Sequence, residues 1–337
     1  MIPILNFWRL VFILMIFFFH FGVFPSGYFP VTFFFILSGF VLTYGYGKEV
    51  LKDSFVYSTF IKKRLIKVYP LHLLCLVYVL ITTYIETQSL PQYVLPNLFL
   101  VQSWIPSRPA FFSCNGVTWF LADILVFYSL FPFVQRLINK HYTACKYGLL
   151  TLLIIYVGCI PFIPKDLYQA IYYVNPLVRM LDFIIGMFLC RWFLQVEEKQ
   201  LNVGNPRLLL LVSVILLTAA IFIHSEIVGS YKVYTYAVLY WLPCCMLIFY
   251  SAIVREMPMK FLCKLGTYSF SFYMIHQLFI IDVNEFLTSI DFPDKVYLRL
   301  FIMLPICYLL GYVINVYFEK PVSSFLLRKF SLQRRKQ

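Results

Sequence analysis

Ten runs of about 18 to 22 mostly apolar residues follow one another along this chain of 337 residues. A run of that length lets a helix cross a lipid bilayer, where each backbone polar group has to be satisfied within the segment. The chain is 61% hydrophobic and only 13% charged, whereas soluble domains are about one quarter charged. The sequence therefore predicts an all-α, polytopic membrane helix bundle with about ten transmembrane helices. The predicted spans are 4–22, 28–46, 66–86, 117–137, 147–163, 173–191, 207–224, 231–252, 266–284 and 298–318.

No linker, low-complexity tract or long extramembrane segment interrupts this pattern. We therefore expect one membrane domain over residues 1–325, followed by a basic cytoplasmic tail at 326–337. The stretch 91–106 is apolar, but it is short and bounded by prolines. It is typical of a re-entrant or interfacial segment rather than of a spanning helix.

The basic residues are distributed unevenly between the two sides of the predicted bundle. Of the 28 Lys and Arg residues, 21 fall on the side that also holds both termini, five fall on the opposite side and two lie within spans. The positive-inside rule therefore places both termini in the cytoplasm. The net charge of +13 is thus explained by topology and by contact with membrane lipids, and it does not indicate nucleic-acid binding.

The nine cysteines form no C-x-x-C pair and no cluster with histidine at the spacing of a metal site. Most of them lie inside apolar runs, where cysteine behaves as a small hydrophobic residue. The sequence predicts no disulfide framework, no metal site and no bound cofactor.

The first apolar run carries one arginine and one histidine, Arg9 and His20. Eleven residues at about 100° per residue make three turns plus roughly 20°, so both side chains leave the same face of a helix. An ionisable side chain within the bilayer is costly and by default indicates function. The alternative is that each side chain extends to its nearer membrane surface.

Four other features place polar side chains in or beside the predicted spans. Arg179 and Asp182 stand at i, i+3, which favours a mutual, structural ion pair. Asp123 would pair with a buried arginine or serve a function, and the sequence does not decide between the two. His72 is expected to be interfacial, and the role of His276 stays open.

A basic run, Lys62-Lys63-Arg64-Leu65-Ile66-Lys67, precedes the third span on the predicted cytoplasmic side. Most such runs only anchor a helix at the membrane surface. The functional alternative is a site for a phosphorylated cytoplasmic ligand, because arginine and lysine suit phosphate oxygens.

Six segments of the chain match family motifs in order. They are NFWRLVFILMIFFFHF with its Arg-x10-His spacing, GYFPVTFFFILSGFVLT, FIKKRLIKVYPLHLL, NGVTWFLADILVFYSLFP, LGTYSFSFYMIH and YFEKPVSSFLLRKF. Together they cover about residues 5–330, and on them the chain resembles the bacterial acyltransferase 3 family. Members of that family are integral membrane enzymes that O-acylate surface polysaccharides and related glycans.

The resemblance implies an acyl-CoA donor, with acetyl as the expected acyl group, and a glycan or lipid-linked oligosaccharide acceptor at the bacterial inner membrane. Arg64 and Lys67, together with Arg9, would hold the donor's phosphates. His20 would then be the general base for the acceptor hydroxyl. The sequence offers neither a G-x-S-x-G elbow nor a Cys-His pairing in support of a covalent nucleophile.

The motif matches also imply substrate-binding roles for five further residues, although helix packing is the alternative role for the aromatic ones. These are Trp119, Asp123, Tyr128, Tyr273 and His276. The chain departs from the family pattern at Lys67, where a second arginine is usual, and at Thr32, where an acidic residue is common. The lysine keeps the positive charge, but it cannot form the paired hydrogen bonds that an arginine guanidinium makes to a phosphate.

A lipid-linked glycan flippase or transporter is the competing function. Arg9 and His20 would there bind a diphosphate or relay protons. It accounts for the composition and the buried charges, but it does not explain the Arg-x10-His spacing together with the later motifs. A flippase works without acyl-CoA, whereas a transferase requires it.

Overall fold

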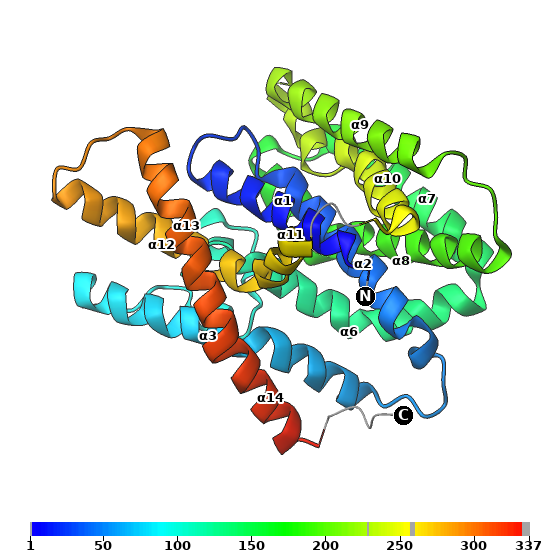
Figure 1. The fold of residues 1–337 in the computed structure, drawn as a ribbon, viewed down its shortest axis with the longest axis horizontal. Coiled ribbons are helices and arrows are strands. Elements are labelled where there is room, and N and C mark those ends of the chain that lie inside the picture. The colour runs from blue at the N-terminus through cyan, green and yellow to red at the C-terminus, as the bar shows by residue number, and fades with distance from the viewer. Residues whose placement is uncertain (1, 228, 257–259, 332–337) are drawn as a thin grey trace.

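The computed structural model describes residues 2–227, 229–256 and 260–331, and these residues form helices and connecting loops without a strand (Figure 1). The α-helices are α1 (Ile4–His20), α2 (Tyr28–Val50), α3 (Tyr57–Thr87), α4 (Val94–Leu98), α5 (Arg108–Phe111), α6 (Trp119–Lys140), α7 (Tyr142–Cys159), α8 (Pro176–Lys199), α9 (Pro206–Glu226), α10 (Val238–Val254), α11 (Lys260–Leu265), α12 (Ser269–Ser289), α13 (Val296–Ile314) and α14 (Lys320–Lys329). Short 3₁₀ or π turns are η1 (Gln102–Trp104), η2 (Ile160–Phe162), η3 (Lys165–Leu167), η4 (Gln169–Val174), η5 (Gly229–Tyr236), η6 (Gly266–Tyr268) and η7 (Asn315–Glu319).

Seven helical segments within the described residues are long and apolar enough to cross a membrane. They are Tyr28–Val50, Tyr57–Thr87, Trp119–Lys140, Tyr142–Phe162, Pro206–His224, Lys232–Val254 and Val296–Lys329. The chain is thus a multi-pass membrane protein. The other three predicted spans correspond to α1, which has 17 residues, and to α8 and α12, whose polar side chains lower their hydropathy.

Two predictions concern segments outside these spans. The stretch 91–106 holds only the short helix α4 and the turn η1, in agreement with a segment too short to span. The helical run of α13, η7 and α14 continues to Lys329, so the first residues of the predicted tail belong to a helix. Residues 332–337 of that tail lie outside the described residues.

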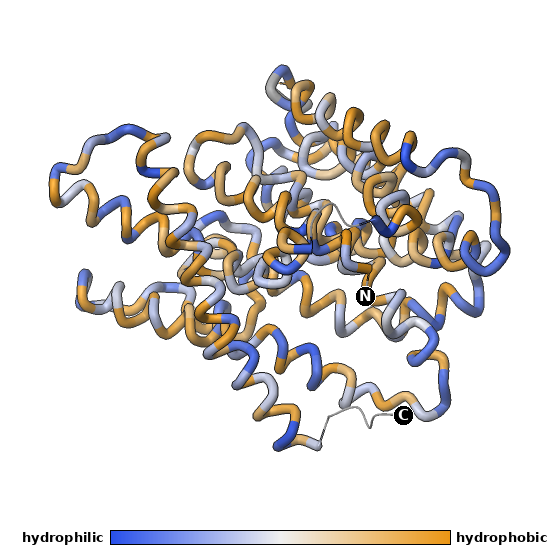
Figure 2. The backbone as a smooth tube through the Cα atoms, viewed as in Figure 1, coloured by the Kyte–Doolittle hydropathy of each residue, from blue (hydrophilic) through white to orange (hydrophobic). Residues whose placement is uncertain are grey.

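Apolar side chains cover the outside of the bundle, as expected for helices that face lipid. Figure 2 shows hydrophobic residues all along the long helices and hydrophilic ones gathered at their ends and in the loops. On α7, α9 and α13, large side chains such as Ile154, Phe222 and Phe301 are each more than 70% exposed. These three helices therefore form part of the lipid-facing surface.

Helix α2 runs through the middle of the bundle and packs most extensively against α8. The two backbones approach closely at two glycines, Gly39 of α2 and Gly186 of α8. A Cβ at Gly39 would lie 2.0 Å from the carbonyl oxygen of Phe183, and a Cβ at Gly186 would lie 2.0 Å from that of Ile36. Small residues permit such contacts between membrane helices. Helix α1 packs against α2 and also contacts α10, α11 and α12 (Figure 1).

The predicted ion pair of Arg179 and Asp182 forms in the core, at 2.8 Å, with both residues 1% exposed. Arg179 also donates to the hydroxyl of Thr32 at 2.9 Å and to the carbonyl of Tyr236 at 3.3 Å. The indole N–H of Trp241 donates to Asp182 at 2.5 Å. The predicted ion pair therefore forms, and it ties α8 to α2, η5 and α10.

We expect Asp182→Ala to destabilise the protein by about 3–5 kcal/mol, because it leaves the buried guanidinium of Arg179 without its counter-charge. Thermal unfolding of the detergent-purified protein measures the effect. The control is the double variant Arg179→Met, Asp182→Leu, which removes both charges and should recover most of the lost stability. A single variant as stable as the wild type would contradict a structural role for the pair.

Candidate active site

Helix α1 borders two neighbouring cavities, one at each end of its Arg9–His20 face. His20 lines the first, which we call the histidine cavity, and Arg9 lines the second, which we call the arginine cavity. Ile16, between them on the same face, lines both. The prediction that Arg9 and His20 share one face of a helix is therefore confirmed.

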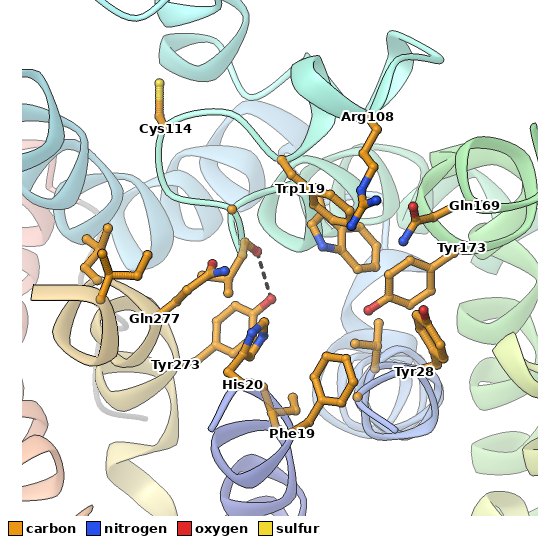
Figure 3. Close-up of a pocket in the computed structure, with 18 residues that line it drawn as sticks. Phe19, His20, Tyr28, Arg108, Cys114, Trp119, Gln169, Tyr173, Tyr273 and Gln277 are labelled. Carbon is orange, nitrogen blue, oxygen red and sulfur yellow. Dashed lines mark hydrogen bonds between the residues drawn. The ribbon is translucent and has the colours of Figure 1, made fainter. Parts of the chain in front are cut away.

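The histidine cavity has a volume of about 400 Å³ and brings together side chains from six parts of the chain (Figure 3). In Figure 3 the aromatic rings of Trp119, Tyr173, Tyr28 and Tyr273 surround it, and His20 reaches into it from α1. Its polar and aromatic lining residues include His20, Tyr28, Arg108, Trp119, Gln169, Tyr173, Tyr273 and Gln277. A half-buried imidazole among polar and aromatic groups is suited to bind a hydroxylated molecule and to accept its proton.

The arginine cavity is smaller, at about 180 Å³, and lies between α1, α2, α3, α6 and α12. Arg9, Lys67, Tyr128 and Glu319 are among its lining residues. The Glu319 carboxylate accepts hydrogen bonds from Ser271 at 2.5 Å and Asn315 at 2.9 Å. Lys67 lies in the combined field of Arg9, Arg64 and Glu319, so this end of the bundle has an excess of positive charge suited to an anion.

Three residues belong to the walls of both cavities: Ile16, Val31 and Tyr273. Tyr273 of α12 is held in place because its hydroxyl donates to the carbonyl of Val117 at 2.8 Å, the bond dashed in Figure 3. A molecule reaching from one cavity into the other would pass these three side chains. They form the partition between the two candidate binding spaces.

His276 lies beside His20, with the two ring centroids 5.1 Å apart. It is fully buried, and its Nδ1 lies 2.6 Å from the carbonyl oxygen of Tyr273. Because a carbonyl can only accept, Nδ1 carries the proton and Nε2 is left as an acceptor, which has no partner among the described residues. His276 is not part of the cavity wall but supports the His20 side of it.

Arg64 lies next to the arginine cavity, stacked on aromatic rings. Its guanidinium carbon is 4.5 Å from the ring centroid of Tyr46, 5.5 Å from that of Phe60 and 5.8 Å from that of Tyr128. These contacts hold the charge by cation–π attraction. Lys67, one turn further along α3, reaches the cavity itself.

Asp123 and His72 belong to a buried polar region where α4, η1 and α6 meet. Asp123 is completely buried, makes no ion pair within the described chain and has Ser103 as its polar neighbour. No arginine of the described chain lies within ion-pair distance of Asp123, although the charge of Arg179 acts on it. His72 is also buried, at 1% exposure, with its Nε2 2.9 Å from the carbonyl oxygen of Asn97. The prediction of an interfacial His72 is wrong, because the segment 91–106 covers it.

Of the sequence-predicted site residues, the two cavities bring together Arg9, His20, Lys67, Trp119, Tyr128 and Tyr273. Arg64, Asp123 and His276 do not line either of these two cavities. Sequence reasoning missed Tyr28, Arg108, Gln169, Tyr173 and Gln277 in the histidine cavity. Gln277 follows directly after the motif histidine, which is a usable signal, whereas nothing in the sequence marks Arg108 or Gln169 as neighbours of His20.

Among the described residues, Cys114 is the cysteine that lines the histidine cavity. Its thiol points away from His20 in Figure 3. Burial raises the pKa of the Cys114 thiol to about 11, so it stays protonated and weakly nucleophilic at neutral pH. Cys114 is therefore poorly placed and poorly activated to act as a covalent nucleophile.

Comparison with known proteins gives one family and one relative. The model of the acyltransferase 3 family, described as an acyltransferase domain, matches residues 2–318. The chain is similar to "Acyltransferase MdmB" of Streptomyces mycarofaciens, with 28% identity over 277 residues. That match covers 73% of this chain and 66% of the relative, so the chain spans about two thirds of the relative's length. No solved structure matches the chain.

Proposed function

Because the chain belongs to the acyltransferase 3 family, a family of acyltransferase enzymes, we propose that it moves an acyl group from acyl-CoA to a glycan hydroxyl. The acyl group in this proposal is acetyl, and the acceptor is a cell-surface polysaccharide or its lipid-linked precursor. The observation that carries the proposal is the pair of adjacent cavities along α1. One is cationic and lined by Arg9, the other holds His20, and Tyr273 belongs to both.

The proposed enzyme lies in the bacterial inner membrane, with about ten spanning helices and both termini in the cytoplasm. The asymmetry of the basic residues supports this orientation. The packing of α1, α8 and α12 among the longer apolar helices supports counting them as spans, because Arg179 and Asp182 of α8 and His276 of α12 are buried inside the bundle. The arginine cavity then lies toward the cytoplasm and the histidine cavity toward the outer surface.

In this arrangement the donor enters from the cytoplasm. Arg9 and Lys67 attract its negative charge, and Arg64 adds a stacked guanidinium beside them. The unbranched pantetheine arm extends through the arginine cavity, so that the thioester reaches the partition at Ile16, Val31 and Tyr273. The acceptor sugar occupies the histidine cavity, where Trp119 and Tyr173 offer aromatic faces.

The transfer itself is a direct attack on the thioester. His20 removes the proton of the acceptor hydroxyl, the sugar oxygen forms a bond to the acyl carbon, and the carbon–sulfur bond breaks. The proton held by His20 then neutralises the departing CoA thiolate. Atoms and charge balance, and the products are the O-acylated glycan and free CoA.

The test is acyl transfer from radiolabelled acetyl-CoA in membranes that contain the glycan acceptor. We expect label in the glycan fraction of membranes that express the protein and none above background in empty membranes. Absence of label with every acyl-CoA tried, despite a verified acceptor, would overturn the proposal. Translocation of the glycan without any acyl-CoA would instead favour the flippase.

His276 is expected to act by positioning His20. Its unpartnered Nε2 is available to accept the N–H of the neighbouring His20 ring, which leaves the other nitrogen of His20 free to take a proton. His276→Phe should lower kcat about ten-fold, the cost of one hydrogen bond, with KM for acetyl-CoA unchanged. His276→Gln keeps an acceptor and should retain most of kcat. Equal losses in both variants would contradict this role.

A further inference from the structure

A third cavity lies at the ends of α2, α3, α6 and α8, at the far side of Arg64 from the arginine cavity. It is the largest of the three, at about 1160 Å³, and the loop between α2 and α3 forms one of its walls. We call it the lysine cavity. Its charged lining residues are Lys48, Lys52, Lys63, Arg191 and Glu49.

The lysine cavity holds polar groups that the protein itself leaves unpaired. Thr43 is only 4% exposed and lines the cavity, yet its hydroxyl has no hydrogen-bond partner within the described chain. The Nε of Arg191, another lining residue, is buried and equally unpartnered. Such groups cost stability unless a ligand or water satisfies them.

The start of α3 adds further positive potential. Thr59 and Lys63, in its first two turns, line the cavity, and among the described residues no side chain caps this end of the 31-residue helix. The N–H groups of a helix N-terminus and the positive end of its dipole attract phosphate. Together with the cationic side chains, this makes the lysine cavity a site for a molecule with several negative charges.

Arg64 separates the lysine cavity from the arginine cavity. Its guanidinium lies 4.5 Å from the ring centroid of Tyr46, which lines the lysine cavity, and 5.8 Å from that of Tyr128, which lines the arginine cavity. The Nε of Arg64 is buried without a partner. A ligand that occupied both cavities would extend past the Arg64 guanidinium. The negatively charged part of that ligand would lie next to it.

The two cavities differ in size, so each can hold a different part of such a ligand. A space of about 180 Å³ around Arg9 accepts a narrow chain but not a nucleotide, whereas about 1160 Å³ accepts a nucleotide with its phosphates. We infer that the lysine cavity binds the phosphorylated nucleotide end of the acyl donor, with Lys48, Lys52 and Lys63 facing its phosphates. This inference rests on the proposed function and extends the donor site from Arg64 and Lys67 to Lys48, Lys52 and Lys63.

Two measurements test the inference together: the affinity for the nucleotide and the choice of acyl donor. The variant carries Lys48→Ala, Lys52→Ala and Lys63→Ala, and the matched control carries Lys260→Ala, Lys264→Ala and Lys295→Ala. The control removes the same charge from exposed lysines at other helix ends. The probes are coenzyme A, adenosine bisphosphate as its nucleotide half, and S-acetylpantetheine, which lacks the nucleotide.

We expect the purified wild type to bind adenosine bisphosphate and the lysine variant to bind it about ten-fold more weakly, because three charge contacts at the cavity wall are lost. KM for acetyl-CoA should rise by a similar factor, while turnover of S-acetylpantetheine should not change. The control variant should match the wild type with every probe.

Several outcomes would overturn the inference. These are wild-type protein that does not bind adenosine bisphosphate, equal losses with acetyl-CoA and S-acetylpantetheine, and equal losses in the control. Loss of co-purifying anionic lipid from the lysine variant, with nucleotide binding intact, would assign the cavity to a lipid headgroup instead. If the wild type bound the nucleotide but transferred no acyl group, the proposed function would fail while the nucleotide site stood.

Discussion

His20→Ala should abolish most acyl transfer, with a fall in kcat of about 10²–10⁴-fold, the usual contribution of a positioned general base. The residue lines the histidine cavity and adjoins the partition at Tyr273, where the acceptor hydroxyl and the thioester would meet. Binding of coenzyme A should be unaffected, because the cationic groups of the donor site lie at the other end of α1. Transfer assays with purified protein, together with a coenzyme A binding measurement, separate the two effects.

The control for this prediction is His20→Gln, which keeps the approximate size and a hydrogen-bonding end but cannot act as a base at neutral pH. It should be nearly as inactive as His20→Ala, at equal protein level and equal thermal stability. Unchanged transfer in both variants would remove His20 from the mechanism while leaving the acyltransferase class in place. Loss of coenzyme A binding in either variant would mean that His20 acts through the donor site or the fold.

Helix periodicity and hydropathy predicted the framework of the site well, because both are local properties of the chain. The eleven-residue spacing of Arg9 and His20 predicted one helix face, and α1 presents both side chains to adjoining cavities. The i, i+3 spacing of Arg179 and Asp182 likewise predicted their ion pair. In each case the geometry of a single helix decides the outcome.

Features that depend on packing between distant segments were not predictable in this way. Arg108, Gln169 and Tyr173 reach the histidine cavity from short segments between the long helices, where neither period nor hydropathy indicates direction. The burial of His72 depends on a segment that looked peripheral in the sequence. Arg64 was expected to contact phosphate directly, and its stacking between aromatic rings of α2, α3 and α6 follows from tertiary contacts alone.

The contact between α2 and α8 should be intolerant of any side chain at its two glycines. Gly39→Ala places a Cβ 2.0 Å from the carbonyl oxygen of Phe183, and Gly186→Ala places one 2.0 Å from that of Ile36. Both obstacles are backbone atoms, which cannot rotate away, so the helices have to separate. We expect each variant to lose about 3 kcal/mol or more of stability, above the usual cost of overpacking. Thermal unfolding and the monodisperse fraction after detergent extraction report the loss.

Gly45 supplies the matched control on α2, because a Cβ there would have no neighbouring atom of the described residues within 4 Å. Gly45→Ala should leave stability unchanged or raise it slightly, since alanine favours a helix by about 1 kcal/mol over glycine. The loss in the other two variants would then report the close contact and not the general effect of replacing a glycine.

Because α2 lines both the histidine and the arginine cavities, partly folded Gly39→Ala protein should also lose acyl transfer and coenzyme A binding together. If Gly39→Ala and Gly186→Ala were as stable as Gly45→Ala, α2 and α8 would not pack at this distance. The position of α2, and with it that of Val31 between the two cavities, would then be wrong.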